Sequence, residues 1–207
     1  MPFIFIHIPR CGGTSVEQAL IPLTTLAQSG LDLSRAERAK HWLEGNRGRQ
    51  HSKVLDFARY VRVGDYFKFA FVRNPWARAV SQIEFLRAGS FRSLFPGRTF
   101  KDNLRIYCEI KEVRHGHDLR ACQFDYLQDN NGGLCVDFVG RFESLEKDFR
   151  HAGRIMGLRP IPVLPHANNS RRKRHYSTYY DAESVEWIRD RFAKDIEYFG
   201  YKFRKES

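Results

Sequence analysis

The chain alternates short apolar runs with longer segments of helical periodicity. Three runs rich in aromatic and β-branched residues predict core strands at Phe3–Ile8, Phe67–Val72 and Cys135–Val139. Helical patterns lie between and after these runs, with a capping-box spacing from Ser34 to Glu37 and a first-turn proline at Pro75. The predicted helices are Thr14–Leu20, Ser34–Gly45, Pro75–Ala88, Phe100–Val113, Glu143–Met156 and Asp181–Phe199. Strands separated by helices predict an α/β layer fold with a mostly parallel sheet.

Length and composition favour one globular domain spanning residues 1–207, because 207 residues with 42% hydrophobic content can bury a core of their own. Lys and Arg number 35 against 24 Asp and Glu, a formal net charge of +11, which favours an anionic partner. The chain begins without a signal-peptide pattern and has no apolar stretch of transmembrane length. We therefore expect a cytoplasmic protein without a transmembrane segment.

The four cysteines, Cys11, Cys108, Cys122 and Cys135, contain no C-x-x-C pair and keep no zinc-ligand spacing with the eight histidines. We therefore predict no metal site. Reduced thiols are the expected state, although the sequence leaves a disulfide among them open.

The segment HIPRCGGTS, residues 7–15, joins the first predicted strand to a helix. Such a turn directs backbone N–H groups and the positive end of the helix dipole toward one point, which favours an anion. Gly12 and Gly13 allow close backbone approach, Thr14 and Ser15 offer hydroxyl donors, and Arg10 adds a planar cation. The alternative is that these residues merely cap the helix.

The turn is not the usual nucleoside triphosphate loop, in which lysine and a magnesium-binding hydroxyl follow the glycines. Here the cation, Arg10, precedes the glycines, and no apolar strand ends in the Asp that accompanies magnesium. This pattern favours a donor whose transfer needs no metal.

A second anion-binding pattern is FAFVRNPWARAVS, residues 69–81. A buried strand delivers Arg73 at its carboxyl end, and the following helix carries Arg78 and Ser81 on nearly the same face. Arg73 and Ser81 are thus candidates to hold one further anionic group. The alternative is that Arg73 and Arg78 are surface arginines near Glu84.

Taken together, the two segments resemble the PAPS-dependent sulfotransferases, in particular the heparan 2-O type of carbohydrate sulfotransferases and their bacterial relatives. The resemblance extends over nearly the whole chain through QFDYL at 123–127, VDFVGRFESLEKDF at 136–149, LPHANNSRRKRHYSTYY at 164–180 and DIEYFGYKF at 195–203.

The resemblance implies a P-loop-like three-layer fold and the donor 3′-phosphoadenosine 5′-phosphosulfate (PAPS), used without a metal. The 5′-phosphosulfate would lie on a loop formed by Arg10, Cys11, Gly12, Gly13, Thr14 and Ser15. Arg73 and Ser81 would hold the 3′-phosphate, and Ser170, Arg171 and Arg174 belong to a segment that would close over the nucleotide. The alternative for the run at 171–174 is a solvated group of charges.

This chain departs from the usual loop sequence HIPKTGGTS at Arg10 and Cys11. A cation at the first of these positions stabilises the charge that grows on the leaving phosphate. Arginine keeps the charge but differs from lysine in shape and reach. Cys11, at a helix N-terminus beside Arg10, is either a thiol of lowered pKa that is open to oxidation or a small replacement for threonine.

An acceptor hydroxyl needs a base, and histidine suits that role near neutral pH. His51, in GRQHSKVLDFARY, lies in a segment similar to the one that supplies the catalytic histidine of the 2-O-sulfotransferases. We predict His51 as the base, with Glu44, Asp56 and His166 as the next candidates. A helix-capping or exposed histidine is the alternative.

The resemblance favours a saccharide hydroxyl as acceptor and no nucleic-acid partner. Trp42, Trp76 and Trp187 offer sugar-stacking faces, or belong to the core, and residues 86–118 are expected to influence acceptor choice. Two other functions remain open: a nucleic-acid-binding module, suggested by the charge and by RRKRHYSTYY, and a divergent P-loop nucleotide kinase.

Overall fold

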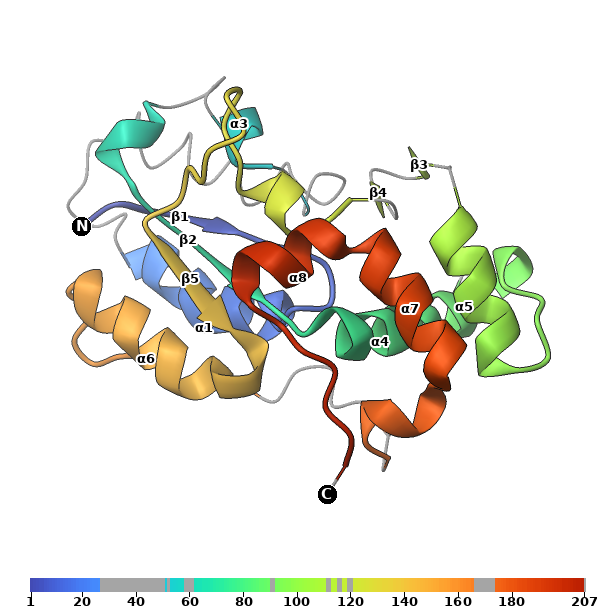
Figure 1. Ribbon diagram of the computed structural model, residues 1–207. Helices are drawn as coiled ribbons and strands as arrows, with labels where there is room; N and C mark the ends of the chain where they lie inside the picture. Colours follow the sequence, from blue (N-terminus) through green and yellow to red (C-terminus); the bar gives the residue numbers. More distant parts are fainter. Residues whose placement is uncertain are drawn as a thin grey trace.

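A three-stranded parallel sheet forms the centre of the fold. The computed structural model describes residues 1–26, 51, 53–57, 62–89, 92–110, 113–114, 117–118, 121–165 and 174–206. Strands β1 (Phe3–Ile6), β2 (Phe67–Val72) and β5 (Phe138–Arg141) pair in the order β1-β2-β5, and all three run parallel. Helices flank this sheet (Figure 1), which confirms the predicted α/β class.

The helices of the described part are α1 (Gly13–Leu26), α3 (Val54–Phe57), α4 (Pro75–Ala88), α5 (Phe100–Glu109), α6 (Leu145–Ile155), α7 (Ala182–Arg191) and α8 (Ala193–Phe199). Short 3-10 turns lie at Val63–Asp65, Arg92–Leu94, Phe124–Tyr126, Phe142–Ser144 and Tyr176–Tyr179, and the two-residue strands β3 (Val113–Arg114) and β4 (His117–Asp118) pair antiparallel. In Figure 1, α1 and α6 run alongside the strands, whereas α4, α5 and α7 form a group next to their carboxyl ends. The predicted helix Ser34–Gly45 lies outside the described residues.

Two predicted strands are corrected by the structure. The first ends at Ile6 instead of Ile8, because the backbone then leaves the sheet to form the turn into α1. The third begins at Phe138 instead of Cys135, because Cys135 N–H donates to the Leu127 carbonyl of a neighbouring hairpin, 2.8 Å away, and pairing with β2 begins only beyond it.

Helix α4 has the predicted bounds, Pro75–Ala88, since its start is specified by the sequence. The Asn74 side chain accepts hydrogen bonds from the backbone N–H groups of Trp76 and Ala77, and Pro75 occupies a first-turn position that needs no N–H donor. The helix predicted for Phe100–Val113 ends at Glu109, where Ile110 adopts an extended conformation. The helix predicted for Glu143–Met156 is a 3-10 turn followed by α6.

The helix predicted for Asp181–Phe199 is two helices, α7 and α8, separated at Phe192. Phe192 leaves helical geometry with φ −121° and ψ 31° while its side chain stays buried. The break redirects α8, which places the carboxylate of Asp195 against the backbone of residues 123–124. Hydrophobic periodicity continues through the break, so the pattern alone predicts one helix.

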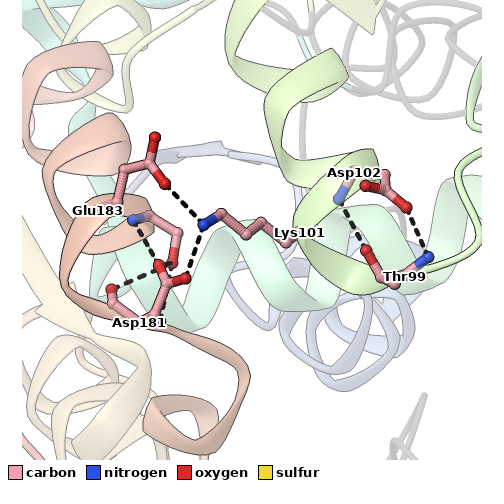
Figure 2. Close-up of polar contacts among 6 residues, drawn as sticks. Thr99, Lys101, Asp102, Asp181 and Glu183 are labelled. Atoms are coloured by element: carbon pink, nitrogen blue, oxygen red, sulfur yellow. Dashed lines mark hydrogen bonds and ion pairs between the residues drawn. The ribbon is translucent and has the colours of Figure 1, made fainter.

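Helices α5 and α7 are tied together at their N-terminal ends (Figure 2). The Lys101 ammonium donates to Asp181 Oδ2 at 2.7 Å and to Glu183 Oε2 at 2.6 Å. Each helix also has a capping box, formed by Thr99 with Asp102 and by Asp181 with Ser184. These groups are exposed, so the ion pairs contribute little to stability.

The side chains of β2 are all buried, which makes it the central strand of one contiguous hydrophobic core. Phe69 contacts the aromatic rings of Phe3, Phe5 and Phe71. In the part of the chain that the structure describes, no helix is both long and apolar enough to cross a membrane.

Lys68 is the charged exception in the buried strand β2. Its ammonium lies 2.8 Å from Asp137 Oδ2 and donates to the Tyr66 carbonyl at 3.0 Å, and its backbone N–H also donates to Asp137 Oδ2 at 2.7 Å. Partial burial alone would raise the pKa of Asp137, but the hydrogen bonds that it accepts from the Lys68 ammonium and the Lys68 backbone N–H lower it below its ordinary value. Because Asp137 precedes β5, this ion pair lies at the edge of the sheet opposite the carboxyl ends of the strands.

We expect Asp137→Asn to lower the free energy of unfolding at pH 7 by about 0.5–1 kcal/mol, a value discounted for the exposure of the carboxylate. A carboxyl with a lowered folded-state pKa stabilises the protein above its unfolded pKa, and the contribution is lost as the pH falls. The difference between wild type and variant should therefore shrink below about pH 4. Urea unfolding at pH 7 and pH 3 measures it, with exposed Asp190→Asn as control. An equal difference at both pH values would contradict the assignment.

Candidate active site

The three parallel strands deliver their loops to one edge of the sheet. In register, Ile6 lies opposite Ala70 and Val72 lies opposite Arg141, so the residues that follow β1, β2 and β5 are neighbours. This edge is where ligands bind in open α/β sheets. The predicted donor residues from β1 and β2 are therefore brought together by topology.

The turn after β1 is compact and feeds directly into α1. Gly12 has a positive φ of 84°, and its carbonyl accepts from the N–H groups of Ser15 at 3.1 Å and Val16 at 3.3 Å. The N–H groups of a helix's first turn have no intrahelical acceptor, and α1 begins at Gly13. Thr14 is half-buried and Ser15 is buried. The structure thus has the strand-to-helix turn on which the predicted anion site depends, and anion binding at this turn stays a prediction.

Backbone conformation requires a glycine at position 12, where φ is positive, and packing requires one at position 13. A Cβ atom on Gly13 would lie 2.1 Å from His7 Cδ2, and one on Gly12 would lie 2.7 Å from Leu145 Cδ2. The His7 ring is held in this place because its Nδ1 donates to Glu17 Oε1 at 2.8 Å. The loop is thus fixed between the His7 ring and the start of α6.

Arg10 joins the two predicted anion sites. Its Nε donates to Ser81 Oγ at 3.1 Å, and its carbonyl oxygen accepts from Arg73 Nη1 at 3.1 Å. Arg10 also has a positive φ of 67°, an uncommon backbone conformation for a side-chain-bearing residue. The residues predicted for the two ends of the donor are therefore one connected set.

Arg73 and Arg78 are not surface arginines, which corrects the alternative interpretation. Arg73 is 6% exposed and its guanidinium lies 4.0 Å from the centre of the Phe142 ring. Arg78 is 4% exposed, and its Nε donates to the Pro9 carbonyl at 3.1 Å. Both cations therefore stabilise the loop after β1.

Gln123 connects the loop to the end of β2. Its side-chain amide accepts from Arg73 N–H at 2.7 Å and donates to the Arg73 carbonyl at 2.9 Å. Asp195 Oδ2 accepts from both the backbone N–H and the side-chain amide of Gln123, at 2.8 and 3.2 Å. Burial raises the pKa of Asp195, although Arg78 and these N–H donors oppose the rise.

Cys11 is a buried structural residue. Its Sγ donates to Gln123 Oε1 at 3.1 Å, and burial raises the pKa of its thiol to about 12 despite the nearby charges of Arg78 and Arg73. This thiol is not activated, so the small-residue interpretation is supported and the oxidisable-thiol alternative is wrong. All four cysteines are free.

Glu143 holds the turn that follows β2. Its carboxylate accepts from Asn74 N–H at 2.8 Å and from Tyr201 Oη at 3.1 Å. The Asn74 side chain donates in turn to the Lys202 carbonyl at 3.1 Å, which fixes the C-terminal segment beside the site. Sequence reasoning missed the roles of Glu143, Gln123 and Asp195; polar residues inside otherwise apolar motifs were the available signal.

His51 lies beside the turn that follows β1. The centres of the His51 and His7 rings are 4.7 Å apart with the rings edge to face, and His51 Nδ1 lies 3.0 Å from the His7 carbonyl oxygen. Because a carbonyl oxygen only accepts, Nδ1 is the protonated nitrogen in this contact, and Nε2 carries the lone pair when the ring is neutral.

The other predicted residues lie elsewhere or outside the described residues. Asp56 accepts from Lys53 N–H at 2.8 Å at the start of α3, which is a structural contact. The side chain of Arg174 is exposed. The positions outside the described residues are Trp42, Glu44, His166, Ser170 and Arg171.

The structure shows the surroundings of two of the three tryptophans. Trp76 is 1% exposed and its Nε1 donates to the Val185 carbonyl at 3.0 Å, so it is a core residue and offers no sugar-stacking face. Trp187 is partly buried against the core. Among the described residues, no cluster of three or more His, Cys, Asp or Glu side chains suits a metal ion.

Comparison with known proteins shows which sequences the chain is similar to. It is 26% identical over 179 residues to human carbohydrate sulfotransferase 9, a match that covers 74% of this chain and 39% of the human protein. It is 29% identical over 93 residues to an uncharacterized protein of Archaeoglobus fulgidus, covering 45% of this chain and 69% of that protein. No solved structure matches significantly. The sequence model of the Sulfotransferase family matches residues 2–202, and the chain therefore belongs to the sulfotransferase family.

Proposed function

We propose that this protein transfers a sulfuryl group from PAPS to a hydroxyl group of a carbohydrate. The observation that carries the donor assignment is the contact of Arg10 with both Ser81 and Arg73, which links the two strand ends predicted to bind anions, beside the start of α1. Family membership favours this reaction over nucleic-acid binding or a kinase activity. The carbohydrate acceptor is supported by the name of the human relative.

The described residues suit a nucleotide with anionic groups at both ends. The backbone of residues 10–15 and the start of α1 would hold the 5′-phosphosulfate, and Arg73 with Ser81 would hold the 3′-phosphate. Ser81 is 3% exposed, and its oxygen already accepts from Arg10 Nε, so its O–H hydrogen is directed to another acceptor. Ser170 and Arg171 remain proposals for closing the nucleotide site, together with Arg174.

Arg10 and His51 would act on opposite sides of the transferred group. PAPS supplies an activated sulfuryl group whose departure leaves negative charge on phosphate. Arg10 would stabilise that charge, with the N–H groups at the start of α1 contributing further. His51 would accept the acceptor's proton at Nε2, since the His7 carbonyl holds its Nδ1 in the protonated form. Neither step requires a metal.

Ligand-dependent stability tests the donor class directly. We expect 3′,5′-adenosine bisphosphate to raise the melting temperature, because a ligand that binds only the folded state stabilises it. ATP with magnesium and a single-stranded oligonucleotide should give little or no shift. A shift with either of these but none with the bisphosphate would refute the donor assignment.

His51→Ala should lower sulfate transfer by about 100-fold or more, the contribution typical of a general base. Binding of 3′,5′-adenosine bisphosphate, measured by calorimetry, should stay within about twofold, since His51 acts on the acceptor. His151→Ala, on the exposed side of α6, is the matched control. Unchanged transfer in His51→Ala would remove His51 from the role.

Ser81→Ala should weaken binding of 3′,5′-adenosine bisphosphate by about tenfold or more, because a hydrogen bond to a charged group is lost. Binding of adenosine 5′-monophosphate, which lacks the 3′-phosphate, should change much less. Ser93→Ala, at an exposed position, serves as control. If Ser81→Ala weakened both nucleotides equally, the 3′-phosphate assignment would be wrong.

A further inference from the structure

The guanidinium of Arg10 contacts two residues of α4 at once. Its Nε donates to Ser81 Oγ at 3.1 Å, and its central carbon lies 4.7 Å from the centre of the Phe85 ring. Ser81 and Phe85 are four residues apart in one helix, so they occupy the same face one turn apart. The contact with Ser81 is made through an edge of the guanidinium, while the aromatic ring lies within cation–π distance of its centre.

Phe85 is unusual on its helix because its side chain is 47% exposed, whereas the apolar residues of α4 before it are buried. Core packing therefore does not account fully for an aromatic residue at this position. The contact with Arg10, at the rim of the candidate site, gives the ring a specific partner.

We propose that Phe85 is a positioning residue, whose ring seats the guanidinium of Arg10 so that Nε stays on Ser81. The proposal rests on the proposed function for the role of Arg10 in transfer. A planar guanidinium can stack on a ring and donate from its edge at the same time, whereas a lysine ammonium is a compact point charge without a flat face. Phe85 thus accounts for arginine at a position where the usual loop of the resembling family has lysine.

The contacts of the Arg10 side chain with Ser81 and Phe85 also affect the backbone of the loop. Arg10 has a φ of 67°, which costs free energy for a residue with a Cβ atom and persists only where surrounding contacts compensate. The hydrogen bond from Arg73 holds the Arg10 carbonyl, and Ser81 with Phe85 holds the other end of the residue. The side chain is then already placed before any ligand arrives, which avoids an ordering cost on binding.

A double-mutant cycle tests whether Phe85 positions the guanidinium of Arg10. The variants are Phe85→Leu, Phe85→Trp, Arg10→Lys and the double variant Arg10→Lys/Phe85→Leu, with exposed Tyr198→Leu on α8 as a control for loss of a surface aromatic. The readouts are urea unfolding without ligand, the Kd of 3′,5′-adenosine bisphosphate, and kcat for sulfate transfer. Because Phe85 is half exposed, the variants should fold.

In unfolding, Phe85→Leu should raise the unfolding equilibrium constant about two- to fivefold more in the natural background than in the Arg10→Lys background, as expected for an exposed cation–π contact. It should lower kcat by a similar factor, while the Kd for the bisphosphate stays within about twofold, and Phe85→Trp should restore kcat. If the effects of Phe85→Leu and Arg10→Lys on unfolding were additive, Phe85 would not position Arg10 and would be an ordinary surface residue. If the wild type neither transferred sulfate nor bound the bisphosphate, the proposed function would be wrong. The unfolding measurements would still show whether Arg10 and Phe85 are coupled.

Discussion

The geometry of the candidate site depends on the hydrogen bonds of the Gln123 side-chain amide. The amide pairs with both the N–H and the carbonyl of Arg73, so it continues the backbone pairing of β2 for one residue beyond the sheet. Its oxygen also accepts from the Cys11 thiol, which ties the turn after β1 to the end of β2. Because the amide is fully buried, losing it would leave several polar groups unsatisfied, at about 1–3 kcal/mol each.

The rest of the chain is arranged to keep this amide in place. Asp195 accepts from the backbone and side chain of Gln123, and it can do so only because the helical segment breaks at Phe192 and redirects α8. Burying a carboxylate is costly unless donors and a cation surround it, and Arg78, two N–H groups of Gln123 and the backbone N–H of Phe124 supply them. The C-terminal segment therefore stabilises the candidate site indirectly, although it lies far from the turn after β1 in sequence.

The sequence predicts well what depends on local pattern and poorly what depends on contacts distant in the chain. The bounds of α4 follow from Asn74 and Pro75, and burial of β2 follows from its apolar run. The break at Phe192 is invisible to periodicity, because the apolar face continues through it. Likewise, Arg73 and Arg78 read equally well as surface arginines until the fold places Pro9 and Phe142 beside them.

The site residues divide in the same way. Arg10, Arg73 and Ser81 could be chosen as candidates because their chemistry, cations and a hydroxyl at strand ends, is recognisable without knowing their partners. Their mutual contact could not be predicted, since it depends on how the turn after β1 folds over α4. That contact changes the interpretation of Arg10: a lysine would supply a single point charge, whereas this arginine belongs to a connected set of residues that extends from the Arg10 carbonyl to α4. An ordered donor group of this kind loses less freedom when charge develops beside it, which is the condition under which a fixed cation stabilises a transition state more than a mobile one.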